Sequence, residues 1–395
     1  MENTLKFEVL STCNSTRART GLMHLPHYTV ETPIFMPVGT KGSVKSLLPD
    51  QLEKIDCQII LGNTYHLGFR PGIELLKKVN GLHNFMGWNR AILTDSGGFQ
   101  MVSLLHLAEI NEHGVKFQSP EDGSECMLTP EKSIEIQNAI GADIIMQLDD
   151  VVPTTLQDSA RMEESTYRTT RWLDRCIKSH KHPEKQNIFP IVQGGLDKDL
   201  RTLSANLHCE RKVNGYAIGG LVGGEAKEDF WRMVSLSTGL LPENKPKYVM
   251  GVGFAVDLVI CCALGADMYD CVFPTRTARF GCALLSSGQI NLKQKTYTMD
   301  FDPIDKNCRC STCKTYSRAY LHQIVAVESV ACNLLSVHNL TYQMDLMKGI
   351  RNSIKENRFP RFVQEFMSNM YPSKNYPQWC IDALQSVNIS LQEDN

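Results

Sequence analysis

The sequence predicts an α/β fold, a (β/α)8 barrel of the TIM type with a small inserted subdomain. Short apolar runs alternate with longer amphipathic segments, eight such runs occur over about 250 residues, and a cysteine cluster interrupts the last unit. A chain of 395 residues is long enough for one large barrel and an appendage. We therefore expect one barrel rather than two domains of equal size.

The eight apolar runs have the length and composition of buried parallel strands. They comprise residues 33–38, 58–62, 91–95, 143–149, 188–193, 215–220, 248–253 and 267–272. Helical periodicity lies between them and is clearest in residues 161–180 and 230–241.

Three segments depart from this alternation. The first thirty residues predict a short hairpin that caps the barrel, and residues 110–127 predict a polar, strand-forming insertion before a helix at 130–139. Residues 296–338 interrupt the closing unit and contain the cysteine cluster.

Five of the predicted strands carry a polar or glycine residue at or near their ends, namely Asp95, Asp149, Gln193, Gly220 and Asp270. Catalytic groups of such barrels collect where strands end, at the carboxyl face. A single strand-end aspartate is more often a helix cap or a turn residue. Five such positions together favour an active site at the barrel mouth.

The residues around these positions fit a flat ligand. Gly97 and Gly98 after Asp95 let backbone approach a ligand closely, with a tight structural turn as the alternative. Asp149 and Asp150 offer a carboxylate to ring N–H groups, or cap the next helix. The glycine-rich segment 219–225 lacks the lysine of a phosphate loop and the spacing of a dinucleotide site, so both are excluded.

The cysteine cluster predicts a metal site formed by Cys308, Cys310, Cys313 and His338. Three thiolates and one imidazole complete a tetrahedral zinc shell without an open position, so the Zn²⁺ should be structural, one per chain. His322 competes as the fourth ligand, and a chance cluster of free thiols is the alternative.

These signals divide the chain into three expected regions. Residues 1–295 form the barrel with its N-terminal hairpin cap, 296–340 form the zinc-binding subdomain, and 341–395 form a C-terminal helical segment that packs on the barrel and ends in a tail.

The overall charge does not identify a partner. Lys and Arg number 41 against 43 Asp and Glu, a net charge of −2. Basic residues outnumber acidic ones between Asp270 and Arg318. In this stretch Arg276 and Arg279 are suited to bind phosphates or bases, with salt bridges at the barrel rim as the alternative.

The sequence shows no signal peptide and no apolar run of membrane-spanning length, which predicts a soluble intracellular protein.

Five motifs in this order resemble the tRNA-guanine transglycosylases. They are the segments 94–100, 219–221, 250–253 and 270–276 and the Cys/Cys/Cys/His set, and the likeness extends from about Arg17 to beyond His338. The resemblance implies a zinc-containing (β/α)8 barrel that replaces guanine at wobble position 34 of G-U-N anticodon tRNAs with a 7-deazaguanine base.

The resemblance also implies a role for each matching residue. Asp270 matches the nucleophile that forms a covalent intermediate with the ribose, and Asp95 matches the general acid/base. The expected base-binding residues are Ser96, Gly97, Gly98, Phe99, Asp149, Gln193, Gly220, Leu221, Gly223 and Met250. The expected RNA-binding residues are Gly251, Val252, Gly253, Asp257, Thr275, Arg276, Thr277, Ala278 and Arg279.

Two positions differ from the bacterial pattern and are similar to the eukaryotic enzymes. Val151 replaces a cysteine, and Gly223 replaces a valine, which opens room for a larger 7-substituent. We therefore expect queuine as the substrate base.

The eukaryotic resemblance further implies a heterodimer with a homologous non-catalytic subunit. It also implies no integral membrane segment, and a cytoplasmic location with peripheral association at the mitochondrial outer membrane.

Three other functions each account for part of the sequence. The main alternative is the non-catalytic, tRNA-binding accessory subunit itself, which the intact Asp95 and Asp270 motifs argue against. An archaeal-type transglycosylase would need an added RNA-binding domain, which we do not expect. A glycoside hydrolase would explain the paired carboxylates but neither the zinc set nor the arginines.

Overall fold

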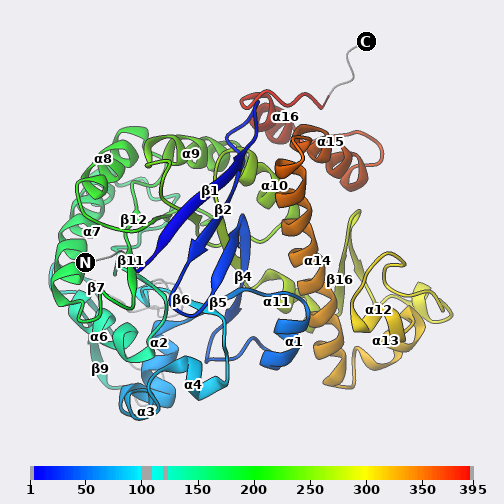
Figure 1. Cartoon of the computed structure of the whole chain (residues 1–395), viewed down its shortest axis with the longest axis horizontal. Helices are drawn as coiled ribbons and strands as arrows, with labels where there is room; N and C mark the ends of the chain where they lie inside the picture. The colour runs from blue at the N-terminus through cyan, green and yellow to red at the C-terminus, as the bar shows by residue number, and fades with distance from the viewer. Residues whose placement is uncertain (1–3, 99–108, 119–122, 392–395) are drawn as a thin grey trace.

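The computed structural model describes residues 4–98, 109–118 and 123–391, and its centre is a parallel barrel surrounded by helices (Figure 1). The strands follow the order β11-β10-β6-β5-β4-β15-β14-β13-β12. Their bounds are β4 (Ile34–Gly39), β5 (Ile59–Gly62), β6 (Ala91–Thr94), β10 (Ile144–Met146), β11 (Asn187–Phe189), β12 (Ile191–Val192), β13 (Tyr216–Ile218), β14 (Lys247–Val249) and β15 (Met268–Cys271). All eight predicted strands are present, and the predicted fold class is confirmed.

Strands β11 and β12 are two halves of one predicted strand, separated by Pro190. Proline has no N–H to donate to a neighbouring strand. Side-chain and backbone bonds bridge the break, because Ile191 N donates to Gln147 Oε1 (3.0 Å) and Ala217 N donates to Pro190 O (2.8 Å). With β11 on β10 and β12 on β13, the sheet closes as a barrel of eight strands.

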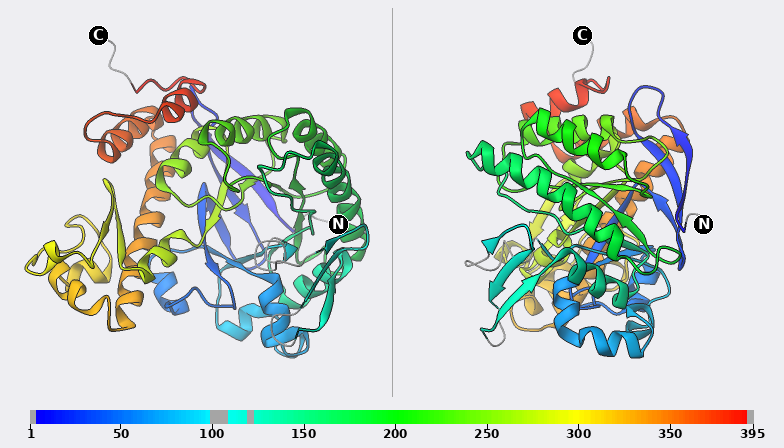
Figure 2. Two further views of the ribbon diagram at one scale, coloured as in Figure 1. Left: turned by 180° about the vertical axis from the view of Figure 1, so that it is seen from behind. Right: turned by 90° about the vertical axis from the view of Figure 1, so that its left-hand side faces the viewer.

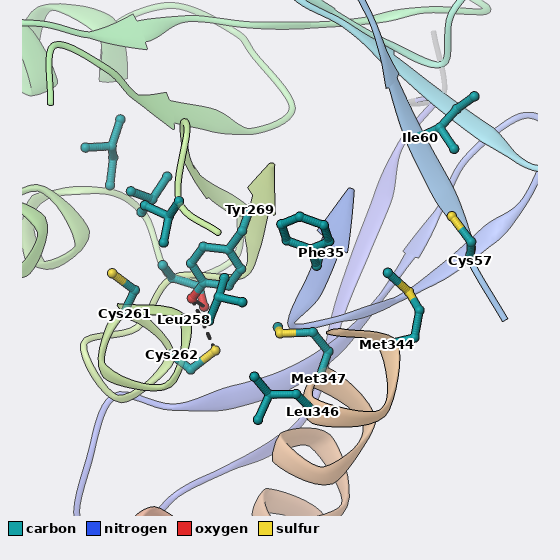
Figure 3. Packing of buried hydrophobic residues seen from close by; sticks show 14 of the residues in the cluster. Phe35, Cys57, Ile60, Leu258, Cys261, Cys262, Tyr269, Met344, Leu346 and Met347 are labelled. Atoms are coloured by element: carbon teal, nitrogen blue, oxygen red, sulfur yellow. Dashed lines mark hydrogen bonds between the residues drawn. The ribbon is translucent and has the colours of Figure 1, made fainter. Parts of the chain in front are cut away.

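Side chains alternate between the barrel interior and the surrounding helices, as the period of two in a strand requires. Met36 and Met268 point inward, whereas Phe35 and Tyr269 point outward. Figure 3 shows the outward layer, in which Phe35 and Tyr269 lie near residues of the helices α10 (Ala255–Ala263) and α14 (Val330–Lys355). Full burial of each large apolar side chain stabilises the fold by roughly 1.5–3 kcal/mol.

Helices follow the strands in chain order. They are α1 (Pro49–Lys54), α2 (Thr64–Leu67), α3 (Ile73–Lys78), α4 (Leu82–Met86), α6 (Pro130–Ile140), α7 (Ser159–Ser179), α8 (Lys198–Cys209), α9 (Lys227–Leu240) and α10, with a π-helical turn at Gly68–Gly72. The local sequence sets these limits: Asp158 caps α7 by accepting from Arg161 N, and Gly141 ends α6 in the left-handed region. The helices predicted at 161–180 and 230–241 correspond to α7 and α9.

The N-terminal cap is larger than the predicted hairpin. It is a three-stranded antiparallel sheet of β1 (Lys6–Thr12), β2 (Arg19–His24) and β3 (Thr29–Thr32). Met23 and Val30 of this sheet join the interior cluster of the barrel, and Arg19 pairs with Asp267 at the start of β15. The sheet therefore closes the amino end of the barrel and leaves the carboxyl end as the mouth.

The predicted insertion lies away from the cap (Figure 2, right). It forms a sheet of β7 (Glu109–Ile110), β8 (Val115–Gln118) and β9 (Glu125–Leu128). The segment after β15 contains α11 (Phe273–Arg279), β16 (Cys282–Leu285), β17 (Gly288–Asn291), a 3-10 turn (Lys295–Tyr297), α12 (Ser311–Thr315) and α13 (Arg318–Ile324).

Helix α14 closes the eighth unit, because it packs on both α11 and β4. The expected boundary at residue 340 falls inside this continuous helix. Two further helices, α15 (Phe359–Met370) and α16 (Gln378–Gln385), follow it. Within the described residues, none of the helices has the length and apolar character needed to span a bilayer.

Candidate active site and metal centre

Strand periodicity directs several of the predicted site residues into the barrel mouth. Each of these residues follows an inward residue of its strand by two positions. Asp270 follows Met268, Gln193 follows Ile191, and Met250 follows Tyr248. Asp95 follows the inward Leu93 by two residues. Because these strands are parallel, their last inward residues lie together above the apolar interior.

The half-buried carboxylate of Asp270 is held from one side. Tyr248 Oη donates to Asp270 Oδ1 at 2.5 Å, and Gly251 N donates to the same oxygen at 2.8 Å. Among the described residues, Oδ2 accepts no hydrogen bond. Burial raises the pKa of Asp270, and the bonds from Tyr248 and Gly251 oppose this shift. One oxygen is therefore fixed and the other is available for reaction.

Asp95 is buried and accepts hydrogen bonds from the end of the neighbouring strand. Thr64 N donates to Asp95 Oδ1 at 2.8 Å, and Asn63 Nδ2 donates to Oδ2. Tyr248 lies near both carboxylates: burial raises its pKa well above the usual value, and the charges of Asp270 and Asp95 raise it further. Tyr248 therefore keeps its proton and remains a donor.

Asp149 forms a polar pocket with two other predicted residues. Ser96 Oγ donates to Asp149 Oδ1 at 3.0 Å, and Gln193 Nε2 donates to Oδ2 at 2.7 Å. Burial raises the pKa of Asp149 to about 6. Gln193 Oε1 is buried without a hydrogen-bond partner among the described residues. An orphan acceptor beside a buried carboxylate is suited to a ligand that donates several N–H groups.

Asp150 points away from this pocket although it adjoins Asp149 in sequence. Its fully buried carboxylate accepts from Arg161 Nη1 at 2.8 Å and from Arg168 Nη1 at 2.7 Å. Only one of the two adjacent carboxylates is therefore available to a ligand.

The glycine-rich loop lies against the same pocket. A Cβ atom added at Gly220 would be 2.3 Å from Gln193 Oε1, so this approach requires glycine. Glu225 closes the loop, because it accepts from Val222 N at 2.6 Å and Gly223 N at 2.8 Å. A Cβ at Gly223 would be 2.1 Å from Thr154 Oγ1, a contact that sequence reasoning did not anticipate.

The four predicted metal ligands lie together. His338 Nδ1 is 3.6, 3.7 and 3.2 Å from the sulfurs of Cys308, Cys310 and Cys313. Bonds of about 2.3 Å to sulfur and about 2.0 Å to nitrogen in a tetrahedron separate S and N by roughly 3.5 Å, so the donor set fits zinc. His338 Nε2 is 2.8 Å from Leu284 O, which directs Nδ1 toward the sulfurs.

His322 is not part of this cluster. Its Nδ1 lies 2.7 Å from Leu292 O and its Nε2 lies 3.3 Å from Thr298 Oγ1, so both ring nitrogens have other partners. The cysteine group that could hold a metal ion contains His338 instead.

Comparison with known proteins identifies the family. The family model described as queuine tRNA-ribosyltransferase matches residues 13–372. The queuine tRNA-ribosyltransferase catalytic subunit of Schizosaccharomyces pombe is 53% identical over 98% of both chains. The chain belongs to the queuine tRNA-ribosyltransferase family. The predicted resemblance is thereby confirmed.

Other queuine tRNA-ribosyltransferase relatives are similar along nearly the whole chain. The Caenorhabditis elegans protein with the name of catalytic subunit is 51% identical over 98% of this chain and 100% of its own. The queuine tRNA-ribosyltransferase of Staphylococcus haemolyticus is 46% identical over 94% and 99%.

The structure separates the residues that the family resemblance assigns to RNA. Arg276 is exposed on α11, and Arg279 is partly exposed with Nη1 bonded to Thr275 O at 3.0 Å. The side chains of Val252, Thr275 and Ala278 are buried. Asp257 is also buried and pairs with Lys227 Nζ at 2.6 Å, so its carboxylate is engaged within the protein.

Several residues of the site were missed by the sequence analysis. Asn63 and Thr64 directly follow a predicted strand, so the strand-end rule could have found them. Tyr248 is an inward residue two positions before Met250, and strand alternation could have found it. Phe99, which the resemblance assigns to the base, lies outside the described residues.

Proposed function

We propose that this chain replaces guanine at position 34 of G-U-N anticodon tRNAs with queuine, by double displacement through a covalent Asp270-ribosyl intermediate. The observation that carries the proposal is the one-sided support of Asp270, which lies at the same end of the barrel as a pocket suited to a flat base. Membership of the queuine tRNA-ribosyltransferase family supports the substrate class.

In the first displacement, Asp270 Oδ2 bonds to C1′ of the ribose as the bond from C1′ to N9 of guanine breaks. The electron pair of that bond leaves on the base, which takes a proton from Asp95 as general acid. The wobble nucleotide must be turned out of its stack to reach these groups.

In the second displacement, the incoming base attacks C1′ and the bond to Asp270 breaks. Asp95 takes the proton that the incoming base loses, which restores its starting state. Negative charge returns to the departing carboxylate, and the hydrogen bonds from Tyr248 and Gly251 to Oδ1 stabilise it. The same two donors therefore make Asp270 a better leaving group.

At Asp149, the proposed base pocket predicts opposite effects of substitution on guanine affinity and on the stability of the free protein. We expect Asp149→Asn to weaken guanine binding but to stabilise the free protein at pH 7.5. Burial raises the pKa from 3.8 to about 6, so the stabilising contribution of the neutral carboxyl is lost as the pH rises through 6. The neutral amide avoids this cost, which is on the order of a few kcal/mol.

Thermal melts at pH 7.5 and pH 4, together with guanine titrations, check this result. The gain in Tm should be largest at pH 7.5 and should shrink to a small fraction at pH 4, where Asp149 of the folded protein is protonated. The orphan Gln193 Oε1 can accept from the new amide, so the fold should tolerate the change. A variant with a lower Tm at pH 7.5 and unchanged guanine affinity contradicts this role of Asp149.

The preference for queuine predicts the effect of Gly223→Val. A branched side chain should narrow the pocket and lower the incorporation of queuine at least ~10-fold relative to a smaller 7-deazaguanine base. The added side chain would also strike Thr154, so the double variant Gly223→Val/Thr154→Ala serves as the control that removes this clash. Equal incorporation of the two bases by both variants would exclude Gly223 as a size filter.

We also propose that the cluster of three cysteines and His338 holds one structural Zn²⁺. The supporting observations are the separation of the nitrogen and sulfur atoms and the fixed orientation of His338. Four protein ligands leave no position for a substrate, so the ion would supply stability rather than chemistry.

Binding of tRNA is supported by basic side chains at the mouth. Arg276 follows β15, and the exposed Lys41 and Lys45 follow the adjacent strand β4.

The proposed heterodimer with a homologous non-catalytic subunit is supported by three exposed apolar side chains of the inserted segment. They are Met299, Phe301 and Val327, which are 74%, 72% and 74% exposed. The proposed cytoplasmic location, with association at the mitochondrial outer membrane, rests on the family resemblance.

The experiment that tests the proposed function is incorporation of labelled guanine into a G-U-N anticodon tRNA by the chain alone and with a candidate partner subunit. We expect exchange in at least the combined sample. If the combined sample is inert while a known catalytic subunit is active with the same tRNA, the chain is the non-catalytic accessory subunit instead.

A further inference from the structure

We propose that Arg201 is a positioning residue for base recognition, because it fixes the peptide groups whose N–H donors face the substrate base. This inference rests on the proposed function. Arg201 lies on α8, outside the residues that the sequence motifs single out, and its side chain is fully buried.

Three hydrogen bonds of Arg201 go to backbone carbonyls of two loops, and a fourth runs from Nη1 to Ser237 Oγ on α9 at 3.5 Å. Nε donates to Gly195 O at 2.7 Å, and Nη2 donates to Gly219 O at 2.9 Å and to Gly220 O at 3.4 Å. Among the described residues, no carboxylate forms an ion pair with it. Burying an unpaired guanidinium is costly, so a purely structural role would be served as well by an apolar side chain.

The geometry of the peptide bond explains what these contacts achieve. In a trans peptide the C=O and the next N–H point in opposite directions. Holding the carbonyls of Gly219 and Gly220 toward Arg201 therefore turns the N–H groups of Gly220 and Leu221 away from it. Neither N–H has an acceptor among the described residues.

These two donors border the proposed base pocket. Cβ atoms added at Gly219 and Gly220 would lie 3.3 Å and 2.3 Å from the amide of Gln193, and Met250 Sδ is 3.4 Å from the first of them. The cation also polarises the peptides, which strengthens their N–H groups as donors. The group they suit is an acceptor on the base, such as the 6-oxo oxygen of guanine.

The test compares guanine with 6-thioguanine, which keeps the ring N–H and amino donors but replaces the 6-oxo acceptor with sulfur, a weaker one. Inhibition of labelled-guanine exchange, by the full-length chain with its partner subunit if exchange requires one, gives the affinity ratio of the two bases. We expect Arg201→Met to reduce the preference for guanine about tenfold or more, with KM for tRNA unchanged. Arg201→Lys keeps the positive charge but loses the planar guanidinium that donates to several carbonyls at once. It should give an intermediate affinity ratio of guanine to 6-thioguanine.

Arg351→Met is the matched control. Arg351 is also buried and donates to a backbone carbonyl, Pro33 O at 2.9 Å, but it lies at the amino end of the barrel and, unlike Arg201, has a carboxylate partner, Glu31 at 3.6 Å. Its loss should lower Tm without changing the guanine to 6-thioguanine ratio. If Arg201→Met does not fold, the affinity ratio of guanine to 6-thioguanine in Arg201→Lys tests the role of Arg201.

A ratio unchanged in the folded Arg201 variants, or changed equally by Arg351→Met, overturns the role of Arg201 and leaves the proposed function intact. Absence of guanine exchange by the unaltered protein overturns both.

Discussion

Asp270→Asn is expected to lower guanine exchange at least ~10³-fold and to abolish any covalent protein-RNA adduct. The amide is neutral and a poor nucleophile, so it cannot bond to C1′ of the ribose. Its oxygen can still accept from Tyr248 and Gly251, so the pocket should keep its shape. Labelled-guanine incorporation and denaturing gels of protein mixed with G-U-N anticodon tRNA measure the two effects.

Asp158→Asn provides the control for this substitution. Asp158 is an exposed N-cap, and asparagine caps a helix equally well, so exchange and adduct should remain at the level of the unaltered chain. Guanine binding by Asp270→Asn, measured separately, shows whether the base pocket survives. An adduct of undiminished yield in Asp270→Asn would falsify the assignment of the nucleophile.

Removal of the metal is expected to unfold the inserted segment and the start of α14. A structural zinc site contributes on the order of 10–16 kcal/mol of apparent binding free energy, which is lost when a ligand is removed. Because α14 packs on α11 and β4, the loss should spread to the mouth of the barrel. We expect Cys313→Ser to lose the ion, to melt at a lower temperature and to lose exchange activity.

Cys332→Ser is the matched control, because Cys332 lies on α14 but outside the ligand cluster. Elemental analysis should find one zinc per chain in the unaltered protein and in Cys332→Ser, but little in Cys313→Ser. One zinc per chain and an unchanged Tm in Cys313→Ser would contradict a structural site formed by these ligands.

The sequence by itself determined the barrel and the set of groups at its mouth. Alternation of side chains along each strand and alternation of strand with helix segments are local properties of the sequence. They predict parallel strands whose last inward residues, such as Asp270 and Gln193, meet above the interior. Close spacing of the three cysteines similarly predicted a metal site, because thiolates three residues apart or fewer can reach one ion.

Only the tertiary structure decided which members of those sets face one another. In the structure His338, and not His322, lies beside the cysteine sulfurs. Asp150 pairs with Arg161, which leaves Asp149 for a ligand, and Thr154 lies against Gly223. The structure also revealed Tyr248 behind the nucleophile and Arg201 behind the glycine-rich loop. These contacts join separate strands, helices and loops, and their geometry depends on how the elements pack, which local periodicity and spacing do not encode.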